Sequence, residues 1–308
     1  QVEGQLFFNS TTNTFKETLL DVPGGTWSSG GSTNTDRESW AGTSGTRDAT
    51  ITFGGFGPAP APKPNTEKYD GSSWTETGDL NSARHGNAGS VNGSQTATLC
   101  FGGSTGSTTA INEEFNGASW TEESDLNQAR FYIMGAGTAT AALGFGGRPP
   151  GSHRTETELW NGSSWTEVSE LNDGRSYGGS AGTSTAAICM GGDSDPSTAN
   201  TEIWNGTSWT EVSELNRVTY GVGGAGTSTD GLCFAGYPGG TPPGTQTEHW
   251  NGSSWTEINE LSTARGYTTG NGATSVAAIC LSGTPGPANY RITEEWNVTL
   301  GNKTITAS

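Results

Sequence analysis

The chain is poor in positive charge. Its 308 residues contain 14 lysines and arginines against 31 aspartates and glutamates, which gives a formal net charge of −17. A strongly negative chain repels phosphate backbones and anionic lipid headgroups, so nucleic acid and membrane surfaces are disfavoured as partners. No apolar run approaches the roughly 20 residues that a membrane-spanning helix needs, so we expect no membrane insertion.

Residues suited to metal or acid–base chemistry are also few. The three histidines, His85, His153 and His249, fall at different positions of the repeat described below, and no metal-ligand spacing is present. A glutamate lies two residues after the regularly spaced tryptophan of most copies, as Glu167 does after Trp165, which indicates a solvated outer face rather than a catalytic pair. We therefore predict no metal site, no cofactor and no catalytic residues.

Glycine and tryptophan, by contrast, are abundant, and tryptophan recurs at a regular step. The sequence has 49 glycines and 11 tryptophans, and six of the tryptophans lie 44 to 47 residues apart. These six are Trp27, Trp74, Trp120, Trp165, Trp209 and Trp255. So regular a period indicates an array of copies of one supersecondary unit.

Each copy is predicted to hold four short strands. Asn161-Gly162 lies between two aromatic-bearing segments, which predicts a hairpin with a two-residue type I′ turn. A Gly/Ala/Thr segment such as 135–138 and an apolar segment such as 142–145 predict a second hairpin. Four strands in about 45 residues are typical of a β-propeller blade. Because space near the axis is crowded, we expect the glycine-rich strand innermost and the tryptophan strand outermost.

Several motifs resemble those of kelch repeats. Leu80-Asn81-Ser82-Ala83-Arg84 precedes an inner strand, a double glycine such as Gly146-Gly147 follows the second strand, and aromatic residues mark the third and fourth strands. The opening segment Gly4–Phe15 and the Gly/Thr/Ser-rich composition further resemble kelch-like proteins encoded by tailed bacteriophages of marine bacteria. The resemblance, which covers almost the whole chain, implies an all-β, six-bladed kelch-like β-propeller of four-stranded antiparallel blades.

Counting strands predicts how the ring closes. Trp27 has no first, second or third strand before it, whereas the copy that contains Trp296 lacks a fourth strand. We therefore expect the N-terminal strand to complete the last blade, which removes an open sheet edge. The alternative is seven blades, in which residues 303–307 complete their own blade and residues 6–15 form half of another. The predicted organisation is an N-terminal hairpin or connector at 1–25, the propeller at 26–297 and a C-terminal tail at 298–308.

The four cysteines, Cys100, Cys189, Cys233 and Cys280, share one position of the repeat. Neighbouring blades stack like sheets at roughly 10 Å, whereas a disulfide needs Cα atoms within about 7 Å. We expect four free, buried thiols that act as small apolar fillers.

Two copies depart from the pattern. Ala235-Gly236 and Ser282-Gly283 replace the double glycine, which predicts looser turns in those blades. Arg217 lies two residues ahead of the position that its counterparts occupy, so a complete ring of arginines is in doubt.

One face of the predicted disc differs from copy to copy. The loops after the double glycine, such as 148–155 and 237–246, vary in sequence, and they emerge on the same face as the arginine turns. Loops on a rigid scaffold commonly build recognition sites. The candidate binding residues on this face are His85, Tyr132, Arg148, His153, Tyr177, Tyr220, Tyr237 and Tyr267. The alternative is structural, with arginines bracing the turns and tyrosines filling space between inner strands.

The resemblance, together with repetition that lacks catalytic asymmetry, favours a non-enzymatic structural or binding protein of a phage particle. It would be a fibre, spike or capsid-decorating appendage of the virion whose variable face contacts other virion proteins, a host-surface glycan or a host protein. A homo-oligomer is compatible with this role. The alternative is an extracellular bacterial adhesin or filament subunit at the cell surface. A third hypothesis, a carbohydrate-active enzyme, needs an asymmetric carboxylate pair in the central mouth.

Overall fold

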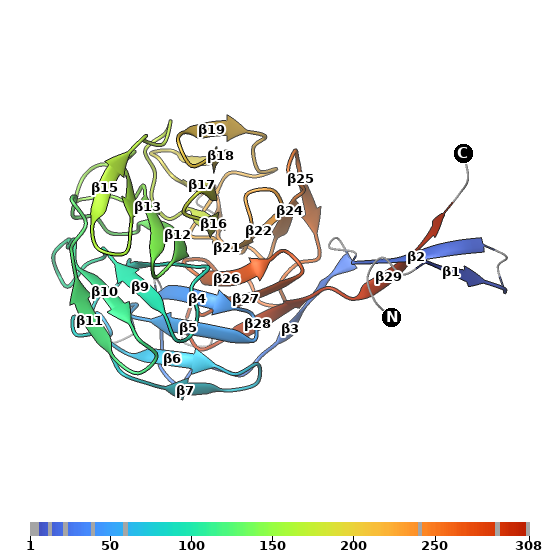
Figure 1. Ribbon diagram of the computed structural model, residues 1–308, viewed down its shortest axis with the longest axis horizontal. Helices are drawn as coiled ribbons and strands as arrows, with labels where there is room; N and C mark the ends of the chain where they lie inside the picture. Colours follow the sequence, from blue (N-terminus) through green and yellow to red (C-terminus); the bar gives the residue numbers. More distant parts are fainter. Residues whose placement is uncertain are drawn as a thin grey trace.

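The computed structural model is an all-β ring of six four-stranded antiparallel sheets, with a smaller sheet projecting from one side (Figure 1). It describes residues 6–11, 14–20, 24–37, 41–57, 61–239, 242–286 and 290–305. Pro58 and Pro60 of one variable loop, and parts of the predicted terminal segments (1–5, 12–13, 21–23 and 306–308), lie outside the described residues. The predicted six-bladed β-propeller is confirmed. None of the described residues belongs to a helix long and apolar enough to cross a membrane.

The innermost strand of each blade is the glycine-rich one, as predicted. These strands contact one another around the central axis, where larger side chains would collide. They are β4 (Gly42–Thr46), β8 (Ala88–Gly89), β12 (Met134–Thr138), β16 (Gly179–Thr183), β21 (Gly223–Gly226) and β26 (Thr269–Thr274). The second strands, buried on both faces, are β5 (Ala49–Phe53), β9 (Thr98–Phe101), β13 (Ala141–Phe145), β17 (Ala186–Asp193), β22 (Gly231–Phe234) and β27 (Ala277–Leu281).

The third and fourth strands form the outer hairpin of each blade. The third strands are β6 (Thr66–Tyr69), β10 (Asn112–Phe115), β14 (Thr157–Trp160), β18 (Ser197–Trp204), β24 (Thr247–Trp250) and β28 (Thr293–Asn297). The fourth strands are β7 (Trp74–Glu76), β11 (Trp120–Glu123), β15 (Trp165–Val168), β19 (Trp209–Val212), β25 (Trp255–Ile258) and, from the N-terminal end of the chain, β3 (Thr26–Ser29).

The ring closes through β3. This strand pairs antiparallel with β28, and Trp27 faces Trp296 in the register of the pair. The last blade therefore has the order β26-β27-β28-β3, with three strands from the C-terminal end and one from the N-terminal end. The predicted closure is confirmed.

The hydrophobic core lies between blades. In one of its clusters, Leu99 and Phe101 of the second blade pack with Ala142, Trp160 and Trp165 of the third. The same contact between a second-strand phenylalanine and the next blade's outer tryptophan recurs around the ring, with ring centroids 4.8 to 4.9 Å apart. Because each blade buries its apolar face only against its neighbours, the ring must be complete to cover all six interfaces.

A hydrogen bond accompanies this packing. The indole Nε1 of Trp120 donates to the Oγ1 of Thr66 in the preceding blade at 3.0 Å, and Trp209 donates to Thr157 in the same way. Trp165 differs because Asn112 stands where the threonine would be, and the buried Nε1 of Trp165 has no hydrogen-bond partner among the described residues.

The outer hairpins have longer turns than predicted. Trp160 pairs directly with Trp165, so the loop has four residues, and Gly162 alone has a positive φ, of 93°. The Asn161 side chain accepts hydrogen bonds from the backbone N–H groups of Ser163 and Ser164. The prediction of a two-residue type I′ turn was wrong because the asparagine closes the loop with its side chain.

The turns after the second strands are conserved in shape rather than loosened. Ala235 and Ser282 adopt positive φ values of 62° and 55°, close to the 61° of Gly146. Gly236 N–H donates to the Arg265 carbonyl at 2.9 Å, as Gly147 N–H does to that of Arg175 at 2.8 Å. The prediction of looser turns was wrong because these backbone hydrogen bonds persist.

The cysteines are free and buried, as predicted. Burial raises the pKa of the Cys100 and Cys189 thiols to about 11 and that of Cys233 to about 12. At neutral pH these thiols are protonated and inert. Cys100 also accepts a hydrogen bond on Sγ from Arg84 at 3.3 Å, so this thiol is more than an apolar filler.

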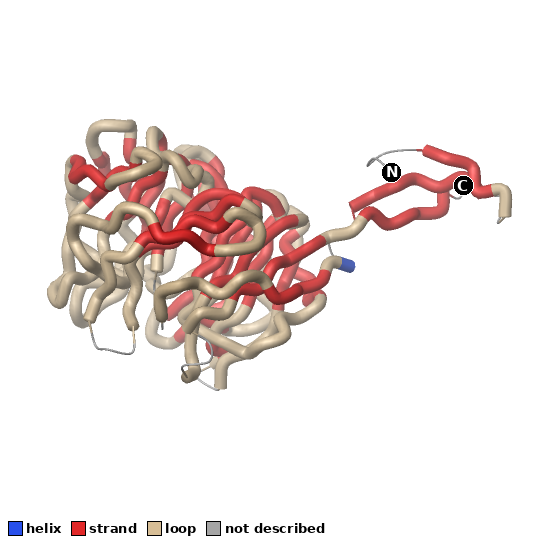
Figure 2. Tube along the Cα trace, turned by 90° about the horizontal axis from the view of Figure 1, so that it is seen from below, coloured by secondary structure: helices blue, strands red, loops and turns tan. Residues whose placement is uncertain are grey.

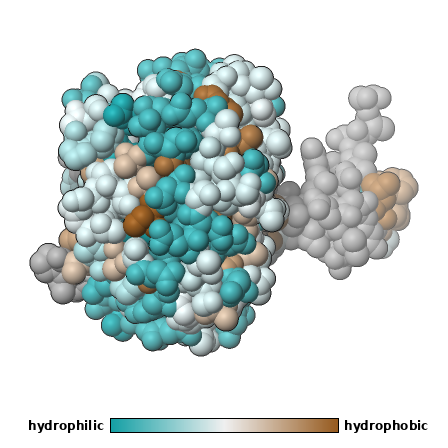
Figure 3. Space-filling view, turned by 60° about the vertical axis from the view of Figure 1, so that its left-hand side comes forward, coloured by the Kyte–Doolittle hydropathy of each residue, from teal (hydrophilic) through white to brown (hydrophobic). Residues whose placement is uncertain are grey.

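The ends of the chain form a separate three-stranded sheet. Strand β2 (Thr14–Leu20) pairs with β1 (Leu6–Asn9) on one side and with β29 (Leu300–Ile305) on the other. This terminal sheet stands away from the disc (Figures 1 and 2). It carries three of the four exposed large hydrophobic side chains of the described residues, and they show as a brown patch at its end in Figure 3: Leu6, Phe8 and Phe15.

Candidate functional site

Buried arginines fix the turns that enter each blade. Arg175 precedes β16, and its Nη2 lies 2.5 Å from Oε1 of Glu202 on β18, with both side chains fully buried. Its Nη1 donates to the carbonyl of Asn200. The equivalent pairs are Arg37–Glu67, Arg84–Glu113, Arg130–Glu158 and Arg265–Glu294. For these residues the structural alternative is correct, since each arginine braces a turn.

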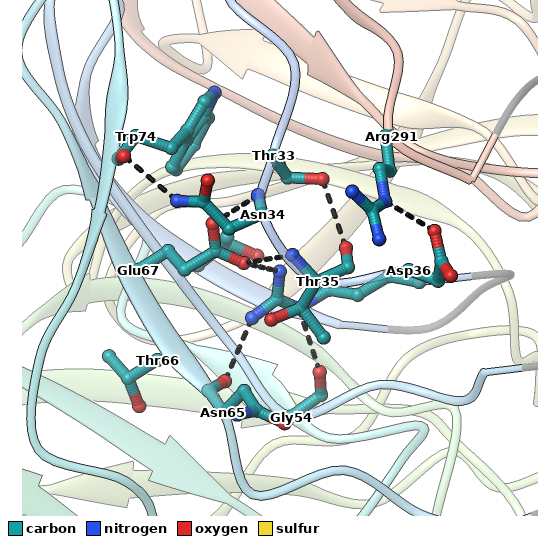
Figure 4. A network of polar contacts seen from close by, with 12 residues as sticks. Thr33, Asn34, Thr35, Asp36, Gly54, Asn65, Thr66, Glu67, Trp74 and Arg291 are labelled. Atoms are coloured by element: carbon teal, nitrogen blue, oxygen red, sulfur yellow. Dashed lines mark hydrogen bonds and ion pairs between the residues drawn. The ribbon is translucent and has the colours of Figure 1, made fainter.

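The glutamate also holds the backbone of the turn. In the first blade, Glu67 accepts hydrogen bonds from the N–H groups of Asn34 and Thr35 as well as from Arg37 (Figure 4). Burial acts to raise the pKa of Glu67, but the charge of Arg37 and these hydrogen bonds hold it below its ordinary value. Sequence reasoning did not identify these glutamates, although Thr-Glu recurs on the third strand at the same period as the arginines.

Arg217 is the irregular member. Its Nε lies 3.6 Å from Glu248, and its Nη1 donates to Gln246 instead. Burial raises the pKa of Glu248, and the more distant Arg217 does not reverse this shift. Every blade therefore has an arginine at its turn, but that of the fifth blade comes from two residues earlier in the sequence and lies farther from its glutamate.

Tyrosines follow the arginines at the mouth of the central channel. Two residues after the arginine, Tyr132, Tyr177 and Tyr267 have positive φ values of 55°, 60° and 52°, where Gly86 and Gly221 occupy the same place in other blades. A bulky residue in this left-handed conformation costs about 1–3 kcal/mol. Hydrogen bonds between successive blades, such as Tyr132 N–H to the Gly86 carbonyl at 2.7 Å, help to hold it.

The glycines leave room for the neighbouring rings. A Cβ on Gly86 would lie 2.9 Å from Tyr132 Cδ1, and one on Gly221 would lie 2.9 Å from Tyr267 Cδ1. Each of these glycines is thus followed, in the next blade, by a tyrosine whose ring lies against it, whereas Tyr132 is followed by a second tyrosine, Tyr177. The equivalent position of the first blade falls in residues 38–40, outside the described part of the chain.

Five tyrosines form one continuous aromatic cluster, which we call the aromatic mouth: Tyr132, Tyr177, Tyr220, Tyr237 and Tyr267. The rings of Tyr132 and Tyr177 are stacked at 4.0 Å, and those of Tyr220 and Tyr237 at 5.5 Å. Tyr267 joins the two pairs, with its centroid 5.7 Å from Tyr177 and 4.9 Å from Tyr237. All five side chains are half-buried, so each keeps part of its surface toward solvent.

The remaining predicted residues lie at the edge of this cluster. His85 is 6.2 Å from the Tyr132 ring and packs on Phe56 at 4.9 Å. Arg148 lies over Phe131, whose ring is 4.2 Å from that of Tyr132. His153 Nδ1 is 3.1 Å from Ser176 Oγ, one residue before Tyr177. All eight candidate residues therefore gather on one face of the disc.

Burial sets the protonation of these groups. It raises the pKa of the Tyr132, Tyr177 and Tyr267 hydroxyls above the ordinary value, and hydrogen bonds with Tyr132 and Tyr220 add to the rise at Tyr177 and Tyr267 respectively. It lowers the pKa of His85 and of His153. At neutral pH the mouth thus presents neutral phenols, suited to stacking and hydrogen bonding, with neutral imidazoles at its edge.

The channel beneath the mouth is narrow. Its cavity measures about 100 Å³, and Tyr132, Tyr177 and Tyr267 line it together with inner-strand residues such as Gly135 and Gly179. Pockets for small organic ligands usually measure about 300–1,000 Å³. A ligand larger than a few water molecules must therefore bind on the mouth and not inside the channel.

No protein-family model matches this chain, and no curated protein matches it by sequence.

Proposed function

We propose that the chain is a non-enzymatic recognition protein whose aromatic mouth binds a surface-exposed partner, with the propeller acting as a rigid head. The observation that carries this proposal is the cluster of five half-buried tyrosines, three of them in a costly left-handed conformation. Residues kept in strained backbone conformations are concentrated at functional sites. Rigid aromatic side chains are also the residues that recognition surfaces use most.

The side chains that line the channel beneath the mouth favour binding rather than catalysis. Among the described residues that line the cavity, none is an aspartate, glutamate, histidine or lysine. The described residues also contain no group of three histidine, cysteine or acidic side chains placed to hold a metal ion. General acid–base chemistry needs such groups within reach of a bound substrate.

The terminal sheet supports a role as an appendage. It projects from the head, and among the described strands its two edges, β1 and β29, have no further partner. Exposed Phe8 and Phe15, with ring centroids 5.3 Å apart, give it an apolar patch. Open edges and apolar faces favour pairing with another chain. We therefore propose that this sheet attaches the head to a phage particle, consistent with the kelch-like phage resemblance of the sequence.

The second candidate is an extracellular adhesin or filament subunit of a bacterial surface. The same open edges favour it, since strand pairing between copies builds filaments. Both candidates place recognition on the aromatic mouth and differ in what the terminal sheet joins.

The proposal predicts that mouth tyrosines are needed for binding but not for folding. The whole chain is screened on an array of immobilised bacterial surface glycans, together with a Tyr220→Ala/Tyr237→Ala variant. We expect binding that falls at least tenfold in the variant, because each aromatic contact contributes about 0.5–1.5 kcal/mol beyond its buried area.

The matched control is Thr166→Ala/Thr210→Ala on the exposed surface of β15 and β19, which should bind like the unmodified chain. Binding that survives the tyrosine change, or that falls equally in the control, would contradict a recognition site at the mouth. Failure to bind both the glycans and the surface of intact host bacteria would contradict the proposal as a whole.

A further inference from the structure

One arginine differs from all the others. The sequence has ten arginines, all within the described residues, and nine of them form an ion pair with an acidic side chain. Arg148 is the exception, since no described acidic group lies within ion-pair distance of it. Among the arginines of a chain with a net charge of −17, it is therefore the one whose charge no described carboxylate balances by an ion pair.

Arg148 is held next to the aromatic mouth. Its backbone exchanges two hydrogen bonds with Phe131, at 3.0 and 2.9 Å, and its guanidinium carbon lies 6.0 Å from the Phe131 ring centroid. Its Nε is buried without a hydrogen-bond partner among the described residues. Phe131, Tyr132 and Tyr177 form successive ring contacts from this point, at 4.2 and 4.0 Å.

The positive charge of Arg148 affects the pKa of two tyrosines of the mouth. It opposes the rise in pKa that burial causes at both Tyr132 and Tyr177. His153 lies on the same loop, and its ring nitrogens face Ser176 and Asp193, at 3.1 and 3.8 Å. Its hydrogen-bonding atoms are therefore directed at those residues and not at the Arg148 guanidinium. The region thus offers a cation beside a stacked aromatic pair.

We propose that Arg148 and the Tyr132–Tyr177 pair form a subsite for an acidic sugar, with the carboxylate on the guanidinium and the sugar ring against the aromatic rings. This inference rests on the proposed function and names the ligand class of the same site. The planar guanidinium matches a carboxylate with two parallel hydrogen bonds, and the negative faces of aromatic rings attract the C–H face of a pyranose. A nucleic acid, with a charge on every phosphate, would be repelled by the chain as a whole.

The test uses trigalacturonic acid and its fully methyl-esterified form, which differ in charge but not in ring structure. Affinities are measured by calorimetry or by saturation-transfer NMR for the whole chain and for Arg148→Gln. We expect the acid to bind at least tenfold more tightly than the ester, and this preference to disappear in Arg148→Gln, since a charge-assisted hydrogen bond contributes more than a neutral one.

Two further variants separate the causes. Arg148→Lys keeps the charge without the planar fork, and we expect it to keep part of the preference. Arg291→Gln removes an exposed arginine that is already paired with Asp36, and we expect the full preference to remain. All variants should melt like the unmodified chain.

The possible outcomes distinguish failure of the Arg148 subsite from failure of the proposed recognition function. Equal binding of acid and ester that needs Tyr220 and Tyr237 would overturn the Arg148 subsite and leave recognition at the mouth intact. A preference for the acid that survives in Arg148→Gln would also overturn it. Absence of binding to both forms at millimolar concentration would overturn the choice of acidic sugar, whereas the proposed function would still be decided by the glycan array and host-cell binding.

Discussion

The arginine turns and the position two residues after the regular arginines, as in Arg175 and Tyr177, are built on opposite principles. At the arginine turns, five of the six blades repeat the same buried ion pair with a glutamate. In the remaining one, the fifth blade, Arg217 and Glu248 are farther apart, at 3.6 Å. At the position of Tyr177, the five described blades carry glycine, tyrosine, tyrosine, glycine and tyrosine in turn. Repetition here marks the residues that hold the ring together, and variation marks the residues that we propose to be used for recognition.

The largest effect should come from breaking the ring itself. Deleting residues 1–30 removes β3, uncovers Trp296 and Phe234, and takes away Trp27, which alone should cost about 3–5 kcal/mol. We expect an aggregating or unfolded product. Deleting residues 1–23 removes β1 and β2 but spares β3, and should leave the melting temperature of the head unchanged. Equal behaviour of the two deletions in light scattering and thermal melting would show that β3 does not close the ring.

A smaller effect should distinguish the regular arginine turns from the irregular one. Glu202→Gln leaves Arg175 buried without its counter-charge and should cost about 3 kcal/mol, as broken buried ion pairs do. Glu248→Gln should cost about 1 kcal/mol or less, because Arg217 is 3.6 Å away and burial already raises the pKa of Glu248.

Denaturant midpoints measure both costs, with the exposed Glu211→Gln as a control that should change stability by less than about 0.5 kcal/mol. Equal losses for Glu202→Gln and Glu248→Gln would contradict the distinction between the two turns.

The fold was predictable because its signals repeat. The spacing of the tryptophans gives the blades, and the unmatched Trp27 and Trp296 give the closure, since a strand without a partner must find one. The turn of the outer hairpin was not predictable from Asn161-Gly162 alone. There the asparagine side chain competes with the backbone for the same N–H groups, and the resulting loop is longer.

That the candidate residues share one face was predictable, whereas the contacts that hold them there were not. Variable loops and tyrosines indicated the face, whereas the role of the arginines depended on Glu67 and its equivalents, which lie about 30 residues away in sequence. From sequence alone, a glutamate on a strand is expected to be solvent-exposed unless its buried partner is known. Likewise, nothing in the residue type of Tyr177 predicts a left-handed backbone. That conformation follows from hydrogen bonds between neighbouring blades, which only the closed ring brings together.

The central claim, that tyrosines occupy the mouth for binding rather than for stability, is tested most directly by replacing them with glycine. In a Tyr132→Gly/Tyr177→Gly/Tyr267→Gly variant, relief of about 1 kcal/mol of backbone strain per site should offset the loss of about 0.5–1.5 kcal/mol of ring contact per site. We expect a melting temperature within a few degrees of the unmodified chain, since about 1 kcal/mol shifts a domain of this size by roughly 2–4 °C, and loss of glycan binding by at least tenfold. A variant that unfolds, or one that melts normally and still binds, would contradict the claim.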